Sequence, residues 1–300
     1  MSRYAIPFGK AGIFSLSNRT DDSKGVSGAA NFRELFGVET FEGKYESVLR
    51  RFAGNDEERV RVFNELAADE TIDLLIAMRG GYGVTRILEG IDFDALRESG
   101  KAVCGYSDVT ALLLAAWKHG CTRLYHGPMI ASTFSTDLNS PEVTQTAEAF
   151  AELLNGEKNL LPSWCRWKVM GEGECRGPLI PMNLTLLCAL CGTEFMPDLN
   201  GAILAVEDIS APAHDIDRKL NQLRQCGILN NLSGIIFGSF SDCENSEYLP
   251  EILREYGDMV NGPSVCGFTF GHIAPSTPLP FGRDVLFRLS SAGGMELQAL

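Results

Sequence analysis

Short apolar runs alternate with helical segments through the first half of the chain. The runs at 11–17, 72–78 and 101–105 have the length and composition of buried strands. Segments 57–68 and 108–119 have apolar residues at helical spacing. The polar residues that follow position 17 predict a loop. Strand and helix in alternation favour an α/β fold built on a parallel, doubly wound sheet.

The pattern changes near residue 140. An amphipathic helix is predicted at 144–154, and a stretch containing Pro and Trp follows at 161–168. Apolar strands return at 201–207 and 232–237, with an amphipathic helix at 216–226 between them. We therefore expect an N-terminal α/β domain at 1–140, an interdomain crossover at 141–175 and a C-terminal domain at 176–300.

Acidic residues outnumber basic ones. The chain has 39 Asp and Glu against 26 Lys and Arg, a formal net charge of −13. Extended nucleic-acid binding needs a basic face, so no nucleic-acid partner is expected. No apolar stretch approaches the ~18 residues that cross a bilayer, and the N-terminus lacks the apolar run of an export signal. We expect no membrane partner and a cytoplasmic location.

The nine cysteines do not have the spacing of a metal site, and no metal is expected. Cys188 and Cys191 form a C-x-x-C motif in the apolar region around 184–190. Two facing thiols on a core helix are favoured over a redox or zinc site. Free thiols fit a reducing compartment.

Ser107 stands between a predicted strand and a predicted helix, in the run Gly105-Tyr106-Ser107-Asp108-Val109. A serine on such a turn exposes its Oγ, and the helix N-terminus directs backbone N–H groups at an oxyanion formed there. The run departs from G-x-S-x-G because Val109 takes the place of the second glycine. A helix cap is an equally good interpretation of Ser107.

A serine nucleophile needs a general base and an acid that orients the base. Of the four histidines, His126 and His272 both suit a site in a loop, and the pattern does not separate them. Glu207 ends the apolar run 201–207, where a buried carboxylate needs a partner such as an imidazole. An ordinary strand-end charge in solvent is the other interpretation of Glu207.

Gly80 and Gly81 follow the predicted strand 72–78. Adjacent glycines let backbone N–H groups turn toward a ligand. No Lys-Ser or Lys-Thr pair follows, so this is not a nucleotide-binding P-loop. If Ser107 is a nucleophile, an oxyanion-hole donor is the economical interpretation of this pair.

Several short motifs resemble those of the LD-carboxypeptidases, a serine peptidase family that also contains the microcin-immunity peptidases. Together they cover nearly the whole chain, and their joint order makes the resemblance specific. The motifs are GNDEER at 54–59, RGGYG at 79–83, GYSDVT at 105–110, YHGP at 125–128, NLTLL at 183–187, VED at 206–208, IDRKL at 216–220 and GH at 271–272.

The resemblance implies that Ser107 is the nucleophile, Glu207 the acid and His272 the base. It assigns the oxyanion hole to the backbone N–H groups of Gly81 and Asp108. It also implies a flavodoxin-like parallel-sheet N-terminal domain plus a smaller β-rich C-terminal domain, with the site at their junction. Similar family members are cytoplasmic homodimers without a cofactor. They release the terminal D-Ala from murein tetrapeptide by cutting the bond after the L-centre of diaminopimelate or Lys.

Substrate contacts are predicted from charge and position. An exopeptidase needs a group that holds the free carboxylate, and Arg79 is the candidate. A structural ion pair with Asp or Glu is its other interpretation. Gly80, Tyr82 and His126 are the further expected contacts. The chain departs from the family at 181–182, where Pro-Met replaces glycines, and at 15–18, and both departures bear on the identity of the substrate.

Two other functions are weighed against this one. The first is a microcin-immunity-like peptidase that acts on aminoacyl-nucleotide mimics, whose members tend to be longer. The second is a non-catalytic two-domain binding protein. That class needs an export signal and would not explain why Ser107, Glu207 and His272 occur together.

Overall fold

The first sheet has the alternation that the apolar pattern predicts. The structure is a computed structural model that describes residues 2–47, 49–290 and 294–300. Strands β1 to β5 are parallel in the order 2-1-3-4-5, the flavodoxin-like order, and β11 adds an antiparallel edge. The strands are β1 (Lys10–Phe14), β2 (Glu39–Glu42), β3 (Leu74–Ala77), β4 (Ala102–Gly105), β5 (Leu124–His126) and β11 (Leu279–Phe281).

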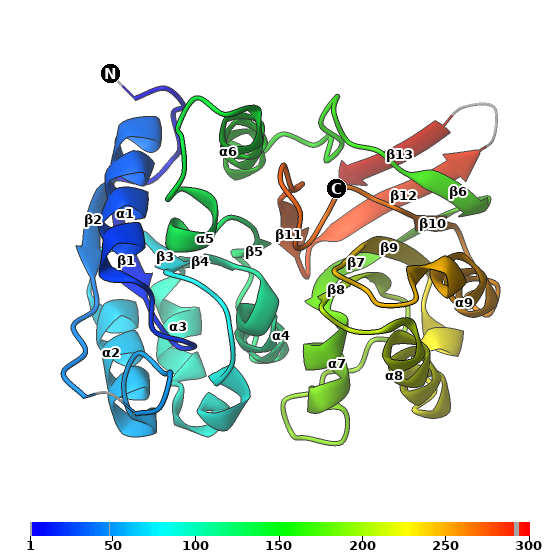
Figure 1. Ribbon diagram of the computed structural model, residues 1–300, viewed down its shortest axis with the longest axis horizontal. Helices are drawn as coiled ribbons and strands as arrows, with labels where there is room; N and C mark the ends of the chain where they lie inside the picture. The colour runs from blue at the N-terminus through cyan, green and yellow to red at the C-terminus, as the bar shows by residue number, and fades with distance from the viewer. Residues whose placement is uncertain (1, 48, 291–293) are drawn as a thin grey trace.

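Helices cover both faces of this sheet (Figure 1). The core divides accordingly: α1, α5 and α6 pack on one face, and α2, α3 and α4 on the other. The elements are α1 (Asp22–Phe36), α2 (Asp56–Ala68), α3 (Phe93–Ser99), α4 (Thr110–Lys118), α5 (Ile130–Thr133) and α6 (Pro141–Leu154), with short 3₁₀ turns η1 (Val84–Arg86), η2 (Leu88–Gly90) and η3 (Ser107–Val109).

A second sheet occupies the C-terminal half. Its order is β13-β12-β7-β8-β9-β10-β6, with β7 to β10 parallel and antiparallel strands at both edges. The strands are β6 (Lys168–Gly171), β7 (Gly173–Asn183), β8 (Ile203–Ile209), β9 (Gly234–Ser241), β10 (Ser264–Cys266), β12 (Asp284–Ser290) and β13 (Gly294–Ala299). The helical elements are α7 (Leu184–Leu190), α8 (Ala213–Gln225), η4 (Leu229–Asn231), η5 (Ser246–Tyr248) and α9 (Leu249–Gly257).

The two halves are joined by packing and by β11. One apolar cluster runs from α4 of the first half into α7 and β8 of the second, including Leu113, Leu187 and Val206. β11 comes late in the chain but pairs with β5, Leu279 opposite His126. The segment that precedes β11 is therefore held at the junction of the two sheets (Figure 1). The expected fold, a flavodoxin-like domain with a smaller β-rich C-terminal domain, is confirmed.

Most predicted elements are present with shifted ends. The run 101–105 forms β4, and 232–237 forms part of β9. The helix predicted at 144–154 begins earlier, because Ser140 Oγ accepts a hydrogen bond from Val143 N at 3.3 Å and Pro141 fits the first turn. The pattern predicts no strand at β2, β5, β6, β7 or β10 to β13. Most of these strands are short or contain Gly or Pro, so their apolar period is weak. That reason does not apply to β12, which has seven residues and neither Gly nor Pro.

The prediction of a loop after β1 is wrong for Asp22–Phe36, because these residues form the helix α1. Asp21 caps the helix by accepting from Ser23 N at 2.9 Å, and Gly37 ends it with a φ of +71°. Its glycines serve close packing. A Cβ at Gly28 would lie 2.4 Å from the carbonyl oxygen of Ile130 in α5. Glycines that suggest a loop in the sequence thus mark a helix contact.

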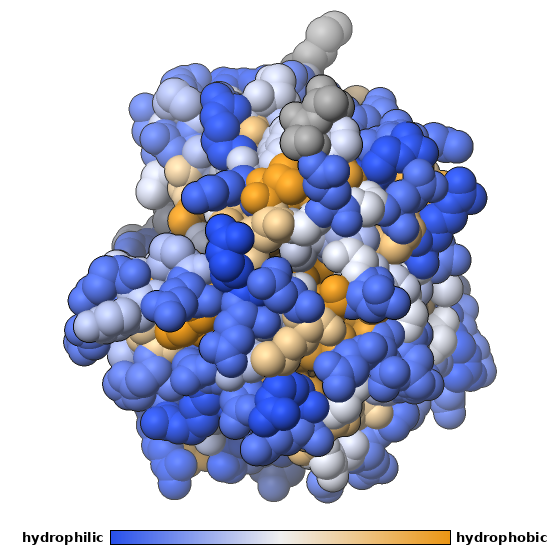
Figure 2. Space-filling model, turned by 90° about the vertical axis from the view of Figure 1, so that its right-hand side faces the viewer, coloured by the Kyte–Doolittle hydropathy of each residue, from blue (hydrophilic) through white to orange (hydrophobic). Residues whose placement is uncertain are grey.

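The surface is mainly hydrophilic on the face that Figure 2 displays, where hydrophobic residues appear in small groups between polar ones. Among the described residues, no helix combines the length and the apolar character needed to cross a bilayer.

Substitution of Gly28 separates helix propensity from packing. Propensity alone predicts that Gly28→Ala stabilises the protein by about 1 kcal/mol. The contact with Ile130 predicts the opposite, a loss of about 1–3 kcal/mol from overpacking. Urea denaturation followed by circular dichroism measures the sign. Ser27→Ala, on the neighbouring half-exposed position, is the control and should change stability by less than about 0.5 kcal/mol. A more stable Gly28→Ala protein would contradict the close contact.

Candidate active site

Ser107 stands on a strained turn directly after β4. Its φ is +62°, a left-handed conformation that residues other than glycine rarely adopt. The chain leaves β4 at Gly105 and enters η3 and α4, so Ser107 occupies a strand-to-helix turn. A Cβ at Gly105 would lie 2.7 Å from Cγ1 of Val109. The bare Gly105 therefore makes room for Val109, which replaces the second glycine of the common motif.

The imidazole of His272 lies between Ser107 and Glu207. Its Nε2 is 3.0 Å from Ser107 Oγ, and its Nδ1 is 2.6 Å from Glu207 Oε2. The N-cap residues of η3 and α4 are Tyr106 and Val109, and the hydrogen bond described for Ser107 Oγ goes to His272. The geometry therefore favours the interpretation of Ser107 as a nucleophile over its interpretation as a helix cap. The three side chains form a continuous serine–imidazole–carboxylate relay.

Glu207 is fully buried near the end of β8. It stands where the register between β8 and β9 shifts, between Val206 and Asp208. Such irregularities redirect side chains. While Oε2 binds His272, Oε1 accepts a hydrogen bond from Asn183 Nδ2 at 3.2 Å. Both carboxylate oxygens are partnered, which is what a charge removed from water requires.

Asn183 connects Glu207 to a second buried acid. Its Nδ2 also lies 3.1 Å from Asp208 Oδ1. Asp208 Oδ2 accepts from Thr185 Oγ1 at 2.7 Å and from Lys219 Nζ at 3.0 Å. The ion pair with Lys219 gives this second buried carboxylate a partner of its own, as a charge removed from water requires.

The His272 loop is held by contacts with β9 and within itself. Ser241 Oγ, at the end of β9, donates to the His272 carbonyl oxygen at 2.7 Å. Gly271 N donates to Ser276 Oγ at 3.1 Å. Gly271 has a φ of +106°, and a Cβ there would lie 2.7 Å from Glu207 Oε2. The close approach of the loop to the carboxylate therefore requires glycine at 271.

The predicted oxyanion-hole residues lie beside the nucleophile. A Cβ at Gly80 would be 2.7 Å from Ser107 Cβ and 3.6 Å from Asp108 N. Gly81 follows with a φ of +134°, and a Cβ there would meet Asn18 Cγ at 2.6 Å. The glycine pair thus fits between the nucleophile turn and the loop after β1. This brings the 80–81 backbone and the Asp108 amide close to the Ser107 side chain.

Buried charges tie together the loops that form this region. Asp108, 1% exposed, accepts from Ser17 Oγ at 2.7 Å and from Val84 N at 3.0 Å. Burial raises the pKa of Asp108, while these two hydrogen bonds act in the opposite direction. The fully buried Arg59 donates to the Gly83 carbonyl oxygen at 3.1 Å. The loops after β1, β3 and β4 meet at the carboxyl ends of parallel strands, where α/β folds place their sites.

Two other predicted contact residues have different surroundings. Arg79 Nε donates to the Gly80 carbonyl oxygen at 3.1 Å and Nη1 reaches that of Arg19 at 3.5 Å. Across the described part of the chain, no carboxylate forms an ion pair with Arg79, so the structural ion pair is not found. Tyr82 is 51% exposed and packs its ring on Phe52 at 5.5 Å. Its described contacts do not include the three residues of the relay.

His126 does not join the relay. It is 2% exposed, and its ring lies 5.8 Å from that of Tyr106 and 4.5 Å from that of Phe270. Burial, followed by the charge of His272, lowers the pKa of His126 to about 3, so this imidazole is neutral. Geometry therefore separates the two histidines that the sequence left equivalent, and it favours His272 as the base.

A cavity of about 630 Å³ adjoins the relay, and its walls include Tyr106, His126 and His272. The described ranges contain no group of three or more His, Cys, Asp or Glu side chains placed to hold a metal ion. Cys188 is buried on α7, as a core thiol should be, whereas Cys191 is half-buried just beyond the helix end.

Three residues with evident positions in the site received no role from the sequence: Asn183, Ser241 and Gly271. Asn183 and Gly271 stand in motifs that carry the family resemblance. The only signal at Ser241 is the run 240–242, Phe-Ser-Asp, which echoes Tyr-Ser-Asp at 106–108. The contacts that give them these positions, Asn183 with Glu207, Ser241 with His272 and Gly271 with Glu207, join residues far apart in the chain, so local pattern could not assign them.

Two family models match the chain. One, described as the LD-carboxypeptidase N-terminal domain, matches residues 11–127. The other, described as the LD-carboxypeptidase C-terminal domain, matches residues 176–286. Fold and family thus define a two-domain peptidase of the carboxypeptidase class. The chain belongs to the LD-carboxypeptidase family.

Relatives cover most of the chain. A probable murein peptide carboxypeptidase of Bacillus subtilis (strain 168) is 32% identical over 275 residues, 87% of this chain and 83% of that protein. The microcin C7 self-immunity protein of Escherichia coli is 30% identical over 260 residues, 77% and 75% of the two chains. The crystal structure of muramoyltetrapeptide carboxypeptidase from Oxalobacter formigenes has a TM-score of 0.86 and 32% identity, over 97% of this chain and 98% of that one.

Gly271→Ala should disrupt the relay while the fold remains. The added Cβ would lie 2.6 Å from Glu207 Cβ, so the His272 loop or the carboxylate must move. We expect the rate at which a fluorophosphonate labels Ser107 to fall about 100-fold, since small misplacements of catalytic groups have effects of this size.

The matched control is Gly267→Ala. Gly267 also has a positive φ, +64°, but its Cβ would meet nothing within 4 Å. It therefore tests an alanine at a positive φ without the contact. Equal labelling rates in the two variants would rule out the contact with Glu207 as the cause.

Proposed function

We propose that the chain is a serine carboxypeptidase that releases the terminal D-Ala of murein tetrapeptide by hydrolysing the L,D peptide bond. The observation that carries the proposal is the relay, with 3.0 Å from Ser107 Oγ to His272 Nε2 and 2.6 Å from His272 Nδ1 to Glu207 Oε2. The similarity to a probable murein peptide carboxypeptidase and to a muramoyltetrapeptide carboxypeptidase supports the substrate class.

In the first step, His272 Nε2 takes the proton of Ser107 while Oγ attacks the scissile carbonyl carbon. The Nδ1–H of His272 donates to Glu207, which keeps the imidazole in the tautomer that leaves Nε2 free to accept. The buried carboxylate also stabilises the imidazolium that forms. The strained turn of Ser107 holds Oγ outside the backbone of α4, where a substrate carbonyl can reach it.

The developing oxyanion is stabilised by backbone N–H groups of Gly81 and Asp108. Gly80 permits the approach of that backbone because a side chain at 80 would collide with Ser107. Removal of one such donor costs about 3 kcal/mol in other hydrolases. The braced loops around Asp108 keep these dipoles oriented before the reaction begins.

The acyl-enzyme forms when the C–N bond breaks. His272 gives its proton to the leaving amino group, and D-Ala departs with its own carboxylate. Water then enters, loses a proton to His272 and attacks the ester carbonyl. Collapse of the second tetrahedral intermediate returns the proton to Ser107 and releases the shortened peptide.

Arg79 is proposed to bind the carboxylate of the departing D-Ala. Its guanidinium has backbone oxygens as its described partners and no acidic side chain. Arg79 directly precedes Gly80, whose backbone lies beside Ser107. A cation on this loop suits a substrate that ends one residue after the scissile bond.

The proposal extends to the setting of the reaction. Cell-wall peptide recycling in the cytoplasm by a homodimer is the expected context. Sedimentation of the purified protein tests the dimer, and cell fractionation tests the location.

Ser107→Ala should abolish D-Ala release. Loss of the nucleophile lowers kcat by about 10⁶-fold in a comparable triad enzyme. The measurement is D-Ala released from murein tetrapeptide, with retention of fold checked by thermal denaturation. Wild type that is labelled at Ser107 by a fluorophosphonate but releases no D-Ala would redirect the assignment to aminoacyl-nucleotide mimics. No labelling and no release would favour the binding protein.

Arg79→Ala should raise KM for the tetrapeptide by roughly 10- to 100-fold, the value of a charge-assisted hydrogen bond. An analogue whose terminal carboxylate is amidated lacks the charge and should show little change. Steady-state kinetics on the two substrates make the comparison. Equal effects of the substitution on both would exclude a role for Arg79 in binding the carboxylate.

A further inference from the structure

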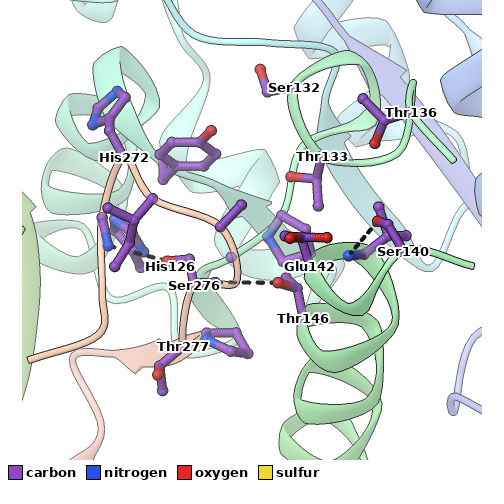
Figure 3. Close-up of a pocket in the computed structure, with 18 of the residues that line it drawn as sticks. His126, Ser132, Thr133, Thr136, Ser140, Glu142, Thr146, His272, Ser276 and Thr277 are labelled. Carbon is purple, nitrogen blue, oxygen red and sulfur yellow. Dashed lines mark hydrogen bonds between the residues drawn. The ribbon is translucent and has the colours of Figure 1, made fainter. Parts of the chain in front are cut away.

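A second cavity lies at the end of α7 that is remote from the relay. The cavity beside the relay is bordered by the loop that carries His272 (Figure 3). The second cavity, of about 280 Å³, lies where α7 and α8 end, and its lining contains the two cysteines Cys191 and Cys226. Asn183, which bonds Glu207, caps the opposite end of α7. Neither thiol has a role in the proposed function.

Contacts between α7 and α8 bring these two thiols together. Figure 1 shows the two helices side by side. About one turn before the helices end, Cys188 Sγ donates to the Lys219 carbonyl oxygen at 3.4 Å, and Gln222 Nε2 donates to the Cys188 carbonyl oxygen at 3.2 Å. Cys191 and Cys226 cap the two helices one turn later. The helical rise therefore carries Cys191 toward Cys226, and a hydrogen bond links their thiols.

The two thiols differ in their surroundings. Cys226 is exposed, whereas Cys191 is half-buried. Burial, the charge of Cys226 and the hydrogen bond with Cys226 raise the pKa of Cys191 to about 11. When Cys226 is a thiolate, a second thiolate at Cys191 is therefore disfavoured. Because the thiolate is the reactive form of cysteine, the exposed Cys226 reacts first with an oxidant, and Cys191 is placed to react second.

Cys188 does not belong to this pair, although it forms the C-x-x-C motif with Cys191. It is buried, and its thiol donates to a backbone carbonyl oxygen. Burial and then the charge of Cys191 raise the pKa of Cys188 to about 12. The spacing in the sequence pairs Cys191 with Cys188, whereas the packing of α7 on α8 pairs it with Cys226.

We propose that Cys191 and Cys226 form a modification site at which a peroxide converts the two thiols into a disulfide. The Cys226 thiolate attacks one oxygen of hydrogen peroxide, the O–O bond breaks, and the products are a sulfenic acid and hydroxide, which becomes water on protonation. Cys191 Sγ then attacks the Cys226 sulfur. The S–S bond forms as the S–O bond breaks, and the departing hydroxide takes the Cys191 proton and leaves as water.

The electrons balance in this sequence, because the two sulfurs lose the two electrons that the peroxide gains. Two thiols and one hydrogen peroxide give one disulfide and two waters. The pair lies at the end of α7 remote from Asn183, and its chemistry does not involve Ser107. The inference is therefore independent of the proposed function, and so is its test.

The test treats the purified full chain with hydrogen peroxide, counts the free thiols after denaturation and maps the unreduced tryptic peptides by mass spectrometry. Wild type should lose two of its nine thiols and yield one peptide containing Cys191 joined to another containing Cys226. Dithiothreitol should restore both thiols. Cys188→Ser and Cys243→Ser are the matched controls, because trypsin leaves each of these cysteines on the same peptide as one member of the pair. Both variants should still form the disulfide.

Cys191→Ser removes the second thiol and should stop the reaction at the sulfenic acid of Cys226. Labelling of Cys226 by dimedone, a reagent that traps sulfenic acids, should then rise at least about 10-fold above wild type, because a neighbouring thiol reacts faster than a dissolved reagent. Cys226→Ser should abolish both the disulfide and this labelling. Circular dichroism checks that each variant is folded.

Three results would overturn the proposal. The first is a disulfide that joins two copies of the chain, seen as a dimer on a non-reducing gel. The second is a disulfide that persists when Cys191 is replaced or disappears in either matched control. The third is a wild type in which Cys226 oxidises to the sulfinic acid while Cys191 stays reduced.

Discussion

The hydrogen bond between the buried Glu207 carboxylate and His272 is the constraint on which the C-terminal part of the site depends. A charge with no exposed surface is tolerated only when its lone pairs are used, and loss of one partner of a buried pair costs about 3–5 kcal/mol. Asn183 uses one oxygen and His272 the other. The loop of His272 must therefore return to β8, which Gly271 allows sterically and Ser241 secures from β9.

The backbone of Ser107, in the first half of the molecule, is held in an energetically unfavourable conformation. Ser107 has a left-handed backbone, and strain of this kind persists only where neighbouring contacts impose it. Asp108 and Arg59 supply such contacts from the core of the first half. Each half thus builds its part of the site with buried charges, and the shared apolar cluster between α4, α7 and β8 sets the distance between the two parts.

Electrostatics across the site are asymmetric. Arg79 precedes the glycine pair beside Ser107, whereas Asp137 and Glu142 line the cavity whose walls include His272. In a protein with an overall charge of −13, Arg79 is a cation whose described partners are backbone oxygens and not acidic side chains.

The sequence alone determined the α/β class, the strands β1, β3 and β4 of the first sheet and the residue types of the site, because burial and turn chemistry act over a few neighbouring positions. The prediction of secondary structure was wrong where a glycine allows close helix packing and does not mark a turn, as at Gly28. It was also wrong where strands lacked a clear apolar period. Only the tertiary structure decided which histidine meets the serine. His272 is 65 residues from Glu207 and 165 from Ser107, and the packing of two sheets brings them within hydrogen-bond range. His126 carries the same chemistry in a similar loop position, but β5 places it in the wall of the cavity.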